Sequence, residues 1–146
     1  MRQLTVLLVE DNPRDVRLTQ RAFKKAGLPH ELRVVRDGDE ALAYLHREGV
    51  YQDPLSAPRP DVMLLDLNLP RMGGHELLHA VKQDSRFKQL PIIVLTTSER
   101  PDDVRQAYDA GANAYLLKPV EFSRFTAVIE QLGKFWLEIV KLPPEG

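Results

Sequence analysis

Five short apolar runs alternate with five segments of helical spacing, and this alternation constrains the fold more than any other feature of the chain. Apolar runs of this length, bounded by turn residues, are typical of strands that helices cover on both faces. The alternation therefore predicts an α/β fold with a parallel sheet, right-handed crossover connections and three layers. The expected strands cover residues 4–9, 32–35, 61–65, 91–95 and 114–117.

The expected helices lie between and after these strands, where apolar residues recur every three or four positions. Proline at the start and glycine at the end mark the boundaries of the first helix. Residues 50–60 interrupt the alternation, and their three prolines predict an exposed loop. The helices are expected at residues 13–27, 38–49, 75–82 and 102–110 and from residue 121 onward.

Length and composition are those of one ordinary domain. The chain has 146 residues, and 20 Lys+Arg against 21 Asp+Glu leave a net charge of −1. No global field then favours nucleic acid or an anionic membrane, so we expect no direct binding to either. Without cysteine there is neither a disulfide framework nor a thiolate metal site. No signal peptide or membrane span is recognisable, so we expect a cytoplasmic protein.

Polar side chains follow the predicted strands at their carboxyl ends. Glu10 and Asp11 follow the first strand, Asp66 the third, Thr96 the fourth and Lys118 the fifth. In a doubly wound, flavodoxin-like sheet of order 2-1-3-4-5, the ends of the first and third strands converge at the switch point. Three carboxylates so close together repel unless a cation neutralises them, and oxygen ligands of this kind suit Mg²⁺. The ammonium of Lys118 would suit a phosphoryl group bound there.

Six short motifs in a fixed order resemble the receiver domains of two-component response regulators. The resemblance covers residues 4 to about 132, nearly the whole chain. It rests on Glu10-Asp11, Asp66-Leu67-Asn68-Leu69-Pro70 with Gly74, Thr96, Ala110-Gly111-Ala112, Tyr115 and Lys118-Pro119.

This resemblance implies a phosphorylation site that depends on Mg²⁺. Asp66 would be the phosphoacceptor, and Lys118 would contact the phosphoryl oxygens. Glu10 and Asp11, with Asp66 and the main-chain carbonyl of Asn68, would hold the metal. The domain would catalyse only its own phosphorylation and dephosphorylation.

The resemblance also implies an activation switch. The hydroxyl of Thr96 would turn toward the phosphoryl group, and Tyr115 would swing inward behind it. The two movements would act on the face formed by the fourth helix, the fifth strand and the fifth helix. In this family the peptide bond between Lys118 and Pro119 is usually cis, so a cis bond is expected here.

The long 50–60 loop and the apolar C-terminus are similar to those of small stand-alone regulators paired with bacterial phytochrome kinases. This similarity implies a sensor histidine kinase of the bacteriophytochrome type as partner. We expect a receiver at residues 1–134 and an apolar extension at residues 135–146. The extension either packs on its own chain or forms a homodimer, alone or with the helix 4–strand 5–helix 5 face. No output domain is expected after Lys118, so the signal would pass through protein contacts.

Two alternatives from other functional classes remain. One is a Mg²⁺-dependent phosphohydrolase that uses the same acidic crevice, although Asn68 stands where such enzymes need a second acid. The other is a zinc peptidase, because His75-Glu76-Leu77-Leu78-His79 matches H-E-x-x-H. The zinc site would need a third ligand, and the expected buried face of this helix leaves both histidines on its other side.

Overall fold

The structure of the protein is a computed structural model that describes residues 3–144, and it contains one sheet of five parallel strands. The strand order, β2-β1-β3-β4-β5, confirms the predicted flavodoxin-like topology. Residues 1, 2, 145 and 146, which belong to the expected receiver and extension, lie outside the described residues. The strands are β1 (Leu4–Val9), β2 (His30–Val35), β3 (Val62–Leu65), β4 (Ile92–Thr96) and β5 (Ala114–Leu117).

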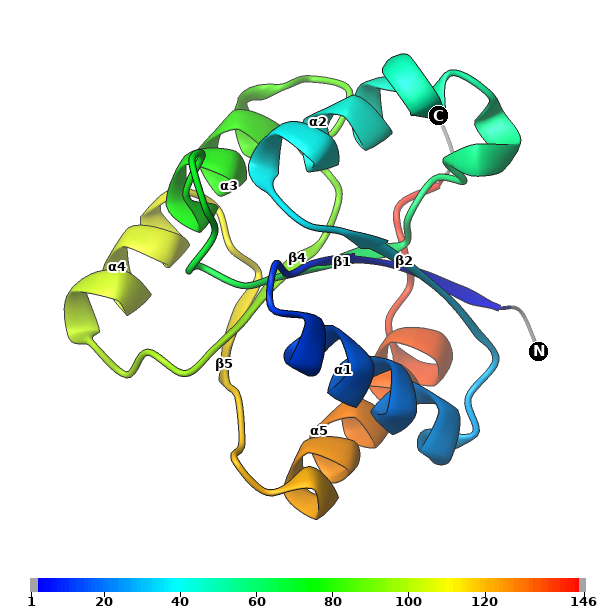
Figure 1. Cartoon of the computed structure of the whole chain (residues 1–146), viewed down its shortest axis with the longest axis vertical. Helices are drawn as coiled ribbons and strands as arrows, with labels where there is room; N and C mark the ends of the chain where they lie inside the picture. Colours follow the sequence, from blue (N-terminus) through cyan, green and yellow to red (C-terminus); the bar gives the residue numbers. More distant parts are fainter. Residues whose placement is uncertain (1–2, 145–146) are drawn as a thin grey trace.

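Helices cover both faces of the sheet, which gives the predicted three layers (Figure 1). Side chains alternate along each strand, so Met63 and Leu65 face one layer while Val62 and Leu64 face the other. Helices α2, α3 and α4 pack on the first face, and α1 and α5 pack on the second. Their bounds are α1 (Pro13–Ala26), α2 (Gly38–His46), α3 (Gly74–Gln83), α4 (Pro101–Asp109) and α5 (Phe122–Lys134).

Helix α1 has well-defined caps at both ends. The Asn12 side chain accepts hydrogen bonds from the backbone N–H groups of Arg14 and Asp15, and Pro13 needs no such partner. Gly27 ends the helix in the left-handed conformation, with φ 69°. These caps fix the first turn of α1, and therefore Asp15, directly after β1.

The segment between α2 and β3 is more ordered than an exposed loop. It forms two short 3₁₀ helices, η1 (Gly49–Tyr51) and η2 (Pro54–Ser56). Ala57 is completely buried, and the Tyr44 hydroxyl donates a 2.6 Å hydrogen bond to the carbonyl of Pro58. The expectation of an exposed loop was therefore correct only for part of residues 50–60.

The C-terminal segment continues α5 as a π-helix, η3 (Phe135–Ile139). Trp136 packs against the apolar core beneath α1 and α5, whereas Phe135 and Ile139 are 48% and 71% exposed. The side chain of Leu137 lies outside the description. Within residues 3–144, no helix has the length and hydrophobicity that crossing a membrane requires.

Candidate functional site

The residues that follow the strands remain part of the sheet's hydrogen bonding. The backbone N–H of Asp66 donates to the carbonyl of Val9 at 3.1 Å, and that of Lys118 donates to the carbonyl of Thr96 at 2.8 Å. Glu10 likewise donates to β2 at 3.0 Å. The backbones of Glu10, Asp66 and Lys118 are therefore fixed at one edge of the sheet, as the sequence predicted.

Lys118 lies at the centre of this edge and contacts three carboxylates. Its Nζ atom is 2.7 Å from Glu10 Oε1, 3.1 Å from Asp15 Oδ2 and 3.2 Å from Asp66 Oδ2. We call Glu10, Asp15 and Asp66 the acidic cluster; one carboxylate oxygen from each lies within 4.8 Å of the others. An ammonium has three donors, and all three have acceptors here. With every group ionised, the four side chains carry a net charge of −2.

Burial and charge shift the pKa values of two groups in this site. Desolvation of Glu10, which is only 3% exposed, raises its pKa to about 7, and the negative charge of Asp66 adds to the rise. Burial alone would lower the pKa of Lys118. Its hydrogen bond to Glu10 and the charges of Asp66 and Glu10 outweigh burial, so the pKa is raised and the ammonium stays charged.

Asp66 is held in place by the turn that follows β3. Its side chain is 10% exposed, and Oδ1 accepts a 3.1 Å hydrogen bond from the backbone N–H of Asn68. The chain then passes close behind it at Gly74. A Cβ atom there would lie 2.5 Å from Leu67 Cα and 2.7 Å from the carbonyl oxygen of Asp66. Only glycine allows this approach, so Gly74 helps to set the position of the carboxylate.

Asp15, and not the predicted Asp11, joins Glu10 and Asp66 around Lys118. Asp11, a predicted metal ligand, is exposed and does not belong to the acidic cluster. Asp15, which the sequence reasoning missed, contacts Lys118 directly. The sequence does contain one indication of this contact. The Asn12-Pro13 start of the helix puts Asp15 in the first turn, next to the end of β1.

The two predicted switch residues belong to a second network, centred on Ser98. Thr96 is fully buried, and its hydroxyl accepts a hydrogen bond from the Ser98 backbone N–H at 3.4 Å. Tyr115 donates its hydroxyl to the Ser98 carbonyl at 2.9 Å. Thr96 and Tyr115 are thus joined through one residue of the β4–α4 loop, which the sequence did not indicate.

The peptide bond between Lys118 and Pro119 is trans, as are the others in the described part of the chain. The expected cis bond is therefore wrong for this structure. Trans is the lower-energy isomer of an X–Pro bond, by about 0.5–1 kcal/mol.

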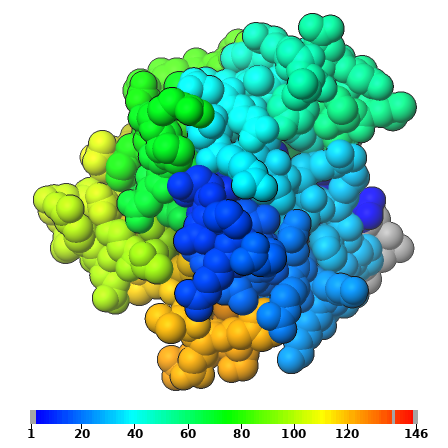
Figure 2. Space-filling view, viewed as in Figure 1, coloured from blue at the N-terminus to red at the C-terminus, as the bar shows by residue number. Residues whose placement is uncertain are grey.

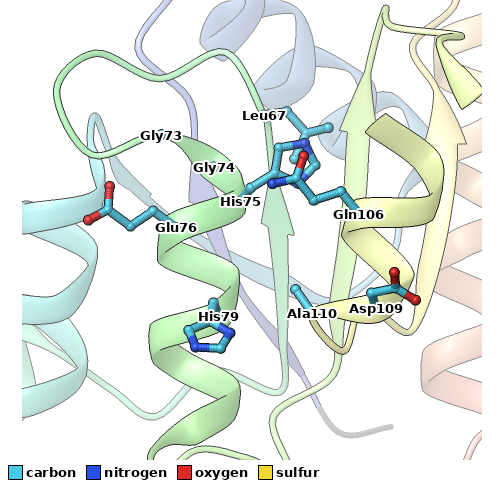
Figure 3. A pocket seen from close by; sticks show the side chains of 9 residues that line it. All are labelled: Leu67, Gly73, Gly74, His75, Glu76, His79, Gln106, Asp109 and Ala110. Atoms are coloured by element: carbon cyan, nitrogen blue, oxygen red, sulfur yellow. The ribbon is translucent and has the colours of Figure 1, made fainter. Parts of the chain in front are cut away.

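The H-E-x-x-H segment lies at the start of α3 and lines a groove between α3 and α4 (Figure 3). Its expected buried face, Leu77 and Leu78, is fully buried. Among the residues that the structure describes, the acidic cluster is the one group of three potential metal ligands close together. No third ligand therefore joins His75 and His79, and a zinc peptidase is not favoured.

Comparison with known proteins identifies the family. The model of the response regulator receiver domain matches residues 6–130. Response regulator Rcp1 of Synechocystis sp. is 42% identical over 138 residues, which cover 94% of this chain and 92% of Rcp1. The phosphorylated cyanobacterial phytochrome response regulator RcpA has a TM-score of 0.90 and 42% identity, over 98% of this chain and 100% of RcpA. The Mn²⁺-bound form of Rcp1 has a TM-score of 0.86 and 41% identity, over 97% of this chain and 99% of that one.

The family model covers the acidic cluster and Lys118. The matches to Rcp1 and RcpA extend beyond it into the C-terminal segment. Among the relatives with this extent of similarity is a cyanobacterial phytochrome response regulator, RcpA. The chain belongs to the response regulator receiver domain family.

Proposed function

We propose that the chain accepts a phosphoryl group on Asp66 from a phosphohistidine of a sensor histidine kinase and signals through protein contacts. The pairing of Asp66 with Lys118 carries this proposal. Asp66 presents a carboxylate at the sheet edge, and the Lys118 ammonium lies 3.2 Å from it. The carboxylate supplies a nucleophile, and the ammonium supplies positive charge where phosphoryl oxygens would arrive.

The transfer is an in-line displacement at phosphorus. A carboxylate oxygen of Asp66 forms the new P–O bond while the P–N bond of the phosphohistidine breaks, and the electron pair remains on the imidazole nitrogen. Lys118 turns a donor from the acidic cluster to the phosphoryl oxygens. Asn68, two residues after Asp66, offers no carboxylic acid to assist hydrolysis. The acyl phosphate is then lost slowly, which favours a switch over the phosphohydrolase alternative.

A divalent cation fits the charge of the crevice, because the carboxylates outnumber the single ammonium. We propose Mg²⁺, held by Glu10, Asp11, Asp66 and the main-chain carbonyl of Asn68. Asp11 directly follows Glu10 and is exposed, which suits an ion that keeps several of its waters. When bound, Mg²⁺ would neutralise charge on the transferring phosphoryl group. A related protein, Rcp1, has a Mn²⁺-bound form.

Thr96 and Tyr115 are proposed to pass the signal onward. Both contact Ser98, so a movement of Thr96 toward the phosphoryl group disturbs the carbonyl that holds Tyr115. Tyr108 and Leu117, 49% and 45% exposed, lie on the α4–β5–α5 face beside this network. That face is the proposed output surface.

The proposed partner is a sensor histidine kinase of the bacteriophytochrome type, as the similarity to RcpA supports. A groove of about 160 Å³ borders Lys118, and Arg14 and Phe122 are among its lining residues. It lies between the start of α1 and the segment after β5, which are neighbours on the face that Figure 2 shows. This groove offers the partner's phosphohistidine a path to Asp66.

The C-terminal segment is proposed to form a homodimer as well as an internal contact. Trp136 packs on its own core, while Phe135 and Ile139 leave apolar surface exposed next to it. Sedimentation velocity of the full chain should give a dimer. The exposed-face variants Phe135→Glu and Ile139→Glu should give a monomer, and a monomeric wild-type chain would contradict the proposal.

The test of the phosphoacceptor is direct. Incubation with Mg²⁺ and acetyl phosphate should add one phosphoryl group per chain, visible by intact mass and lost on mild base treatment. Asp66→Asn should gain none. Asp61→Asn, at the opposite end of β3, is the matched control and should still be phosphorylated. Acid-labile phosphate on Asp66→Asn would overturn the assignment.

A further inference from the structure

The loop between β3 and α3 contains a residue in an unfavourable backbone conformation. Arg71 has φ 58°, in the left-handed region that residues with a side chain rarely adopt. Such a conformation persists where the surrounding contacts hold it. The same loop follows Asp66 and carries Asn68, whose main-chain carbonyl is a proposed Mg²⁺ ligand. The contacts that hold Arg71 therefore bear on the metal site.

The side chain of Arg71 is held at the start of α2, beside which the loop lies (Figure 1). Its Nη2 atom donates a hydrogen bond to Oδ2 of Asp37, whose side chain is only 16% exposed. Asp39 is a weaker neighbour, because its Oδ2 lies 3.8 Å from Arg71 Nε and accepts no hydrogen bond from it. Asp37 is therefore the partner that fixes the guanidinium.

Asp37 is itself fixed by contacts that do not involve this loop. It is the N-cap of α2, and its Oδ1 accepts a 2.8 Å hydrogen bond from the backbone N–H of Glu40. Glu40 in turn accepts hydrogen bonds from the backbone N–H of Arg36 at 2.7 Å and from the Tyr51 hydroxyl at 3.0 Å. Tyr51 belongs to η1, so the ordered segment between α2 and β3 supports the anchor from the other side.

Met72 attaches the next residue of the loop to the same place. A Cβ atom on Gly38 would lie 2.7 Å from Met72 Sδ, so the missing side chain at Gly38 lets Met72 approach the helix start closely. Met72 is half-buried and packs against the core. Two consecutive loop residues, one through charge and one through apolar contact, are thus joined to the first residues of α2.

We propose that Arg71 is a positioning residue of the metal site. Its ion pair with Asp37 holds the β3–α3 loop in the conformation in which the Asn68 carbonyl binds Mg²⁺. The proposal rests on the Mg²⁺ site proposed above and adds a residue to it. A protein that adopts its binding conformation for only a fraction of the time binds more weakly by that fraction. Loss of the ion pair should therefore lower the affinity for Mg²⁺, although Arg71 is not a ligand.

The alternative is that Arg71 is an ordinary surface arginine. Its side chain is 68% exposed, and many exposed ion pairs contribute little. In that case only its charge would act on the metal, and removing a positive charge near a cation site tightens cation binding. The two explanations therefore predict opposite signs for the same variant.

The first test is a calorimetric titration of the full chain with Mg²⁺. Arg71→Asn removes the guanidinium, and asparagine tolerates the left-handed backbone. This variant should bind Mg²⁺ about threefold more weakly, the effect of losing one partly buried ion pair. Unchanged or tighter binding would overturn the proposal.

The second test asks whether the effect passes through Asp37. Asp37→Ser keeps a capping oxygen for α2 but loses the carboxylate that Arg71 needs, so it should weaken Mg²⁺ binding as Arg71→Asn does. The double variant should add little, because both changes remove one contact. Asp39→Ser is the matched control, since it removes the same charge two positions away without a hydrogen bond to Arg71, and it should bind like the wild type. Additive losses, or an equal loss in Asp39→Ser, would overturn the proposed route.

A third readout needs no metal. The backbone N–H of Gly74 donates to the Leu67 carbonyl at 3.1 Å and closes the loop. In the Mg²⁺-free chain its hydrogen exchange, followed by NMR, should be about threefold faster in Arg71→Asn and unchanged in Asp39→Ser. The backbone N–H of Asp66, which is bonded within the sheet, is the internal reference and should keep its rate. Wild-type exchange at Gly74 in Arg71→Asn would contradict the proposal.

Failure of this proposal and failure of the proposed function are distinguishable. A wild-type chain that binds no Mg²⁺, or gains no phosphate on Asp66, would contradict the proposed function. A wild-type chain that binds Mg²⁺ no more tightly than Arg71→Asn and Asp37→Ser would contradict only the role of Arg71.

Discussion

Lys118 donates a 2.7 Å hydrogen bond from Nζ to Oε1 of Glu10, and this pair is the most buried of the contacts that Lys118 makes with the acidic cluster. Both side chains are buried, at 10% and 3% exposure. The same ammonium reaches Asp15 and Asp66, so one cation serves three carboxylates. Any divalent ion or phosphoryl group that enters the crevice must therefore share its partners with Lys118.

Glu10 should make the free energy of unfolding depend on pH. Burial raises its pKa from 4.5 to about 7, so the folded state holds this proton more tightly than the unfolded chain. The stabilisation is complete below about pH 4.5 and is lost as pH rises toward about 7. Without Mg²⁺, urea unfolding should show the wild type losing on the order of 2 kcal/mol more than Glu10→Gln between pH 5 and pH 8. Parallel losses in the two proteins would show that Glu10 is ionised throughout.

Lys118→Met should destabilise the metal-free protein by about 3 kcal/mol, because it leaves buried carboxylates without their cation. Mg²⁺ should restore part of this loss, and phosphorylation by acetyl phosphate should become slower. Chemical denaturation with and without Mg²⁺ measures the first two effects. Lys88→Met, at an exposed position, is the control and should change neither. Equal stability of the two variants would mean that the ammonium is not needed in the resting state.

Asp11 and Asp15 should differ in their effect on the metal. Asp15 shares Lys118 with Glu10 and Asp66, while Asp11 is exposed and lies outside the acidic cluster. Asp11→Asn should weaken Mg²⁺ binding roughly tenfold or more, and Asp15→Asn by less than about threefold. Calorimetric titration of both variants checks this order. The reverse order would make Asp15 the ligand.

Gly74→Ala should disturb the turn that holds Asp66. The new methyl group would meet backbone atoms of Leu67 and Asp66, which cannot turn away as a side chain can. We expect a loss of about 1–3 kcal/mol in the free energy of unfolding, with weaker Mg²⁺ binding. A Cβ at Gly73 meets nothing within 4 Å, so Gly73→Ala is the control. Similar losses in both variants would show that the close approach at Gly74 is not the cause.

The sheet and its polar edge were predictable because local pattern decides them. An apolar run that ends in Asp66 before a Pro/Gly turn fits few structures, and the strand ended at Leu65, as expected. The apolar pattern was weaker in β2, which is an outermost strand of the sheet. β2 begins at His30, two residues before its apolar run, because an edge strand tolerates polar residues such as Glu31.

Contacts between distant segments were not predictable. The approach of Asp15 to Lys118 joins residues 103 positions apart and depends on how α1 packs on the sheet. The hydrogen bond from Ser98 to Asp103 is local, yet nothing in a Ser–Asp spacing of five distinguishes it from a solvated loop. The ordered turns within residues 50–60 depend likewise on the tertiary contact between Tyr44 and Pro58.

Trp136 is the single tryptophan of the chain, and it lies half-buried at the junction of α5 with the tail. Its indole is therefore an intrinsic optical probe of that junction alone. Emission excited selectively at the red edge of the indole band comes from one defined place, with no background from other tryptophans. Release of the tail from the core, whether by a partner or by a second copy of the chain, can thus be followed in the unlabelled native protein.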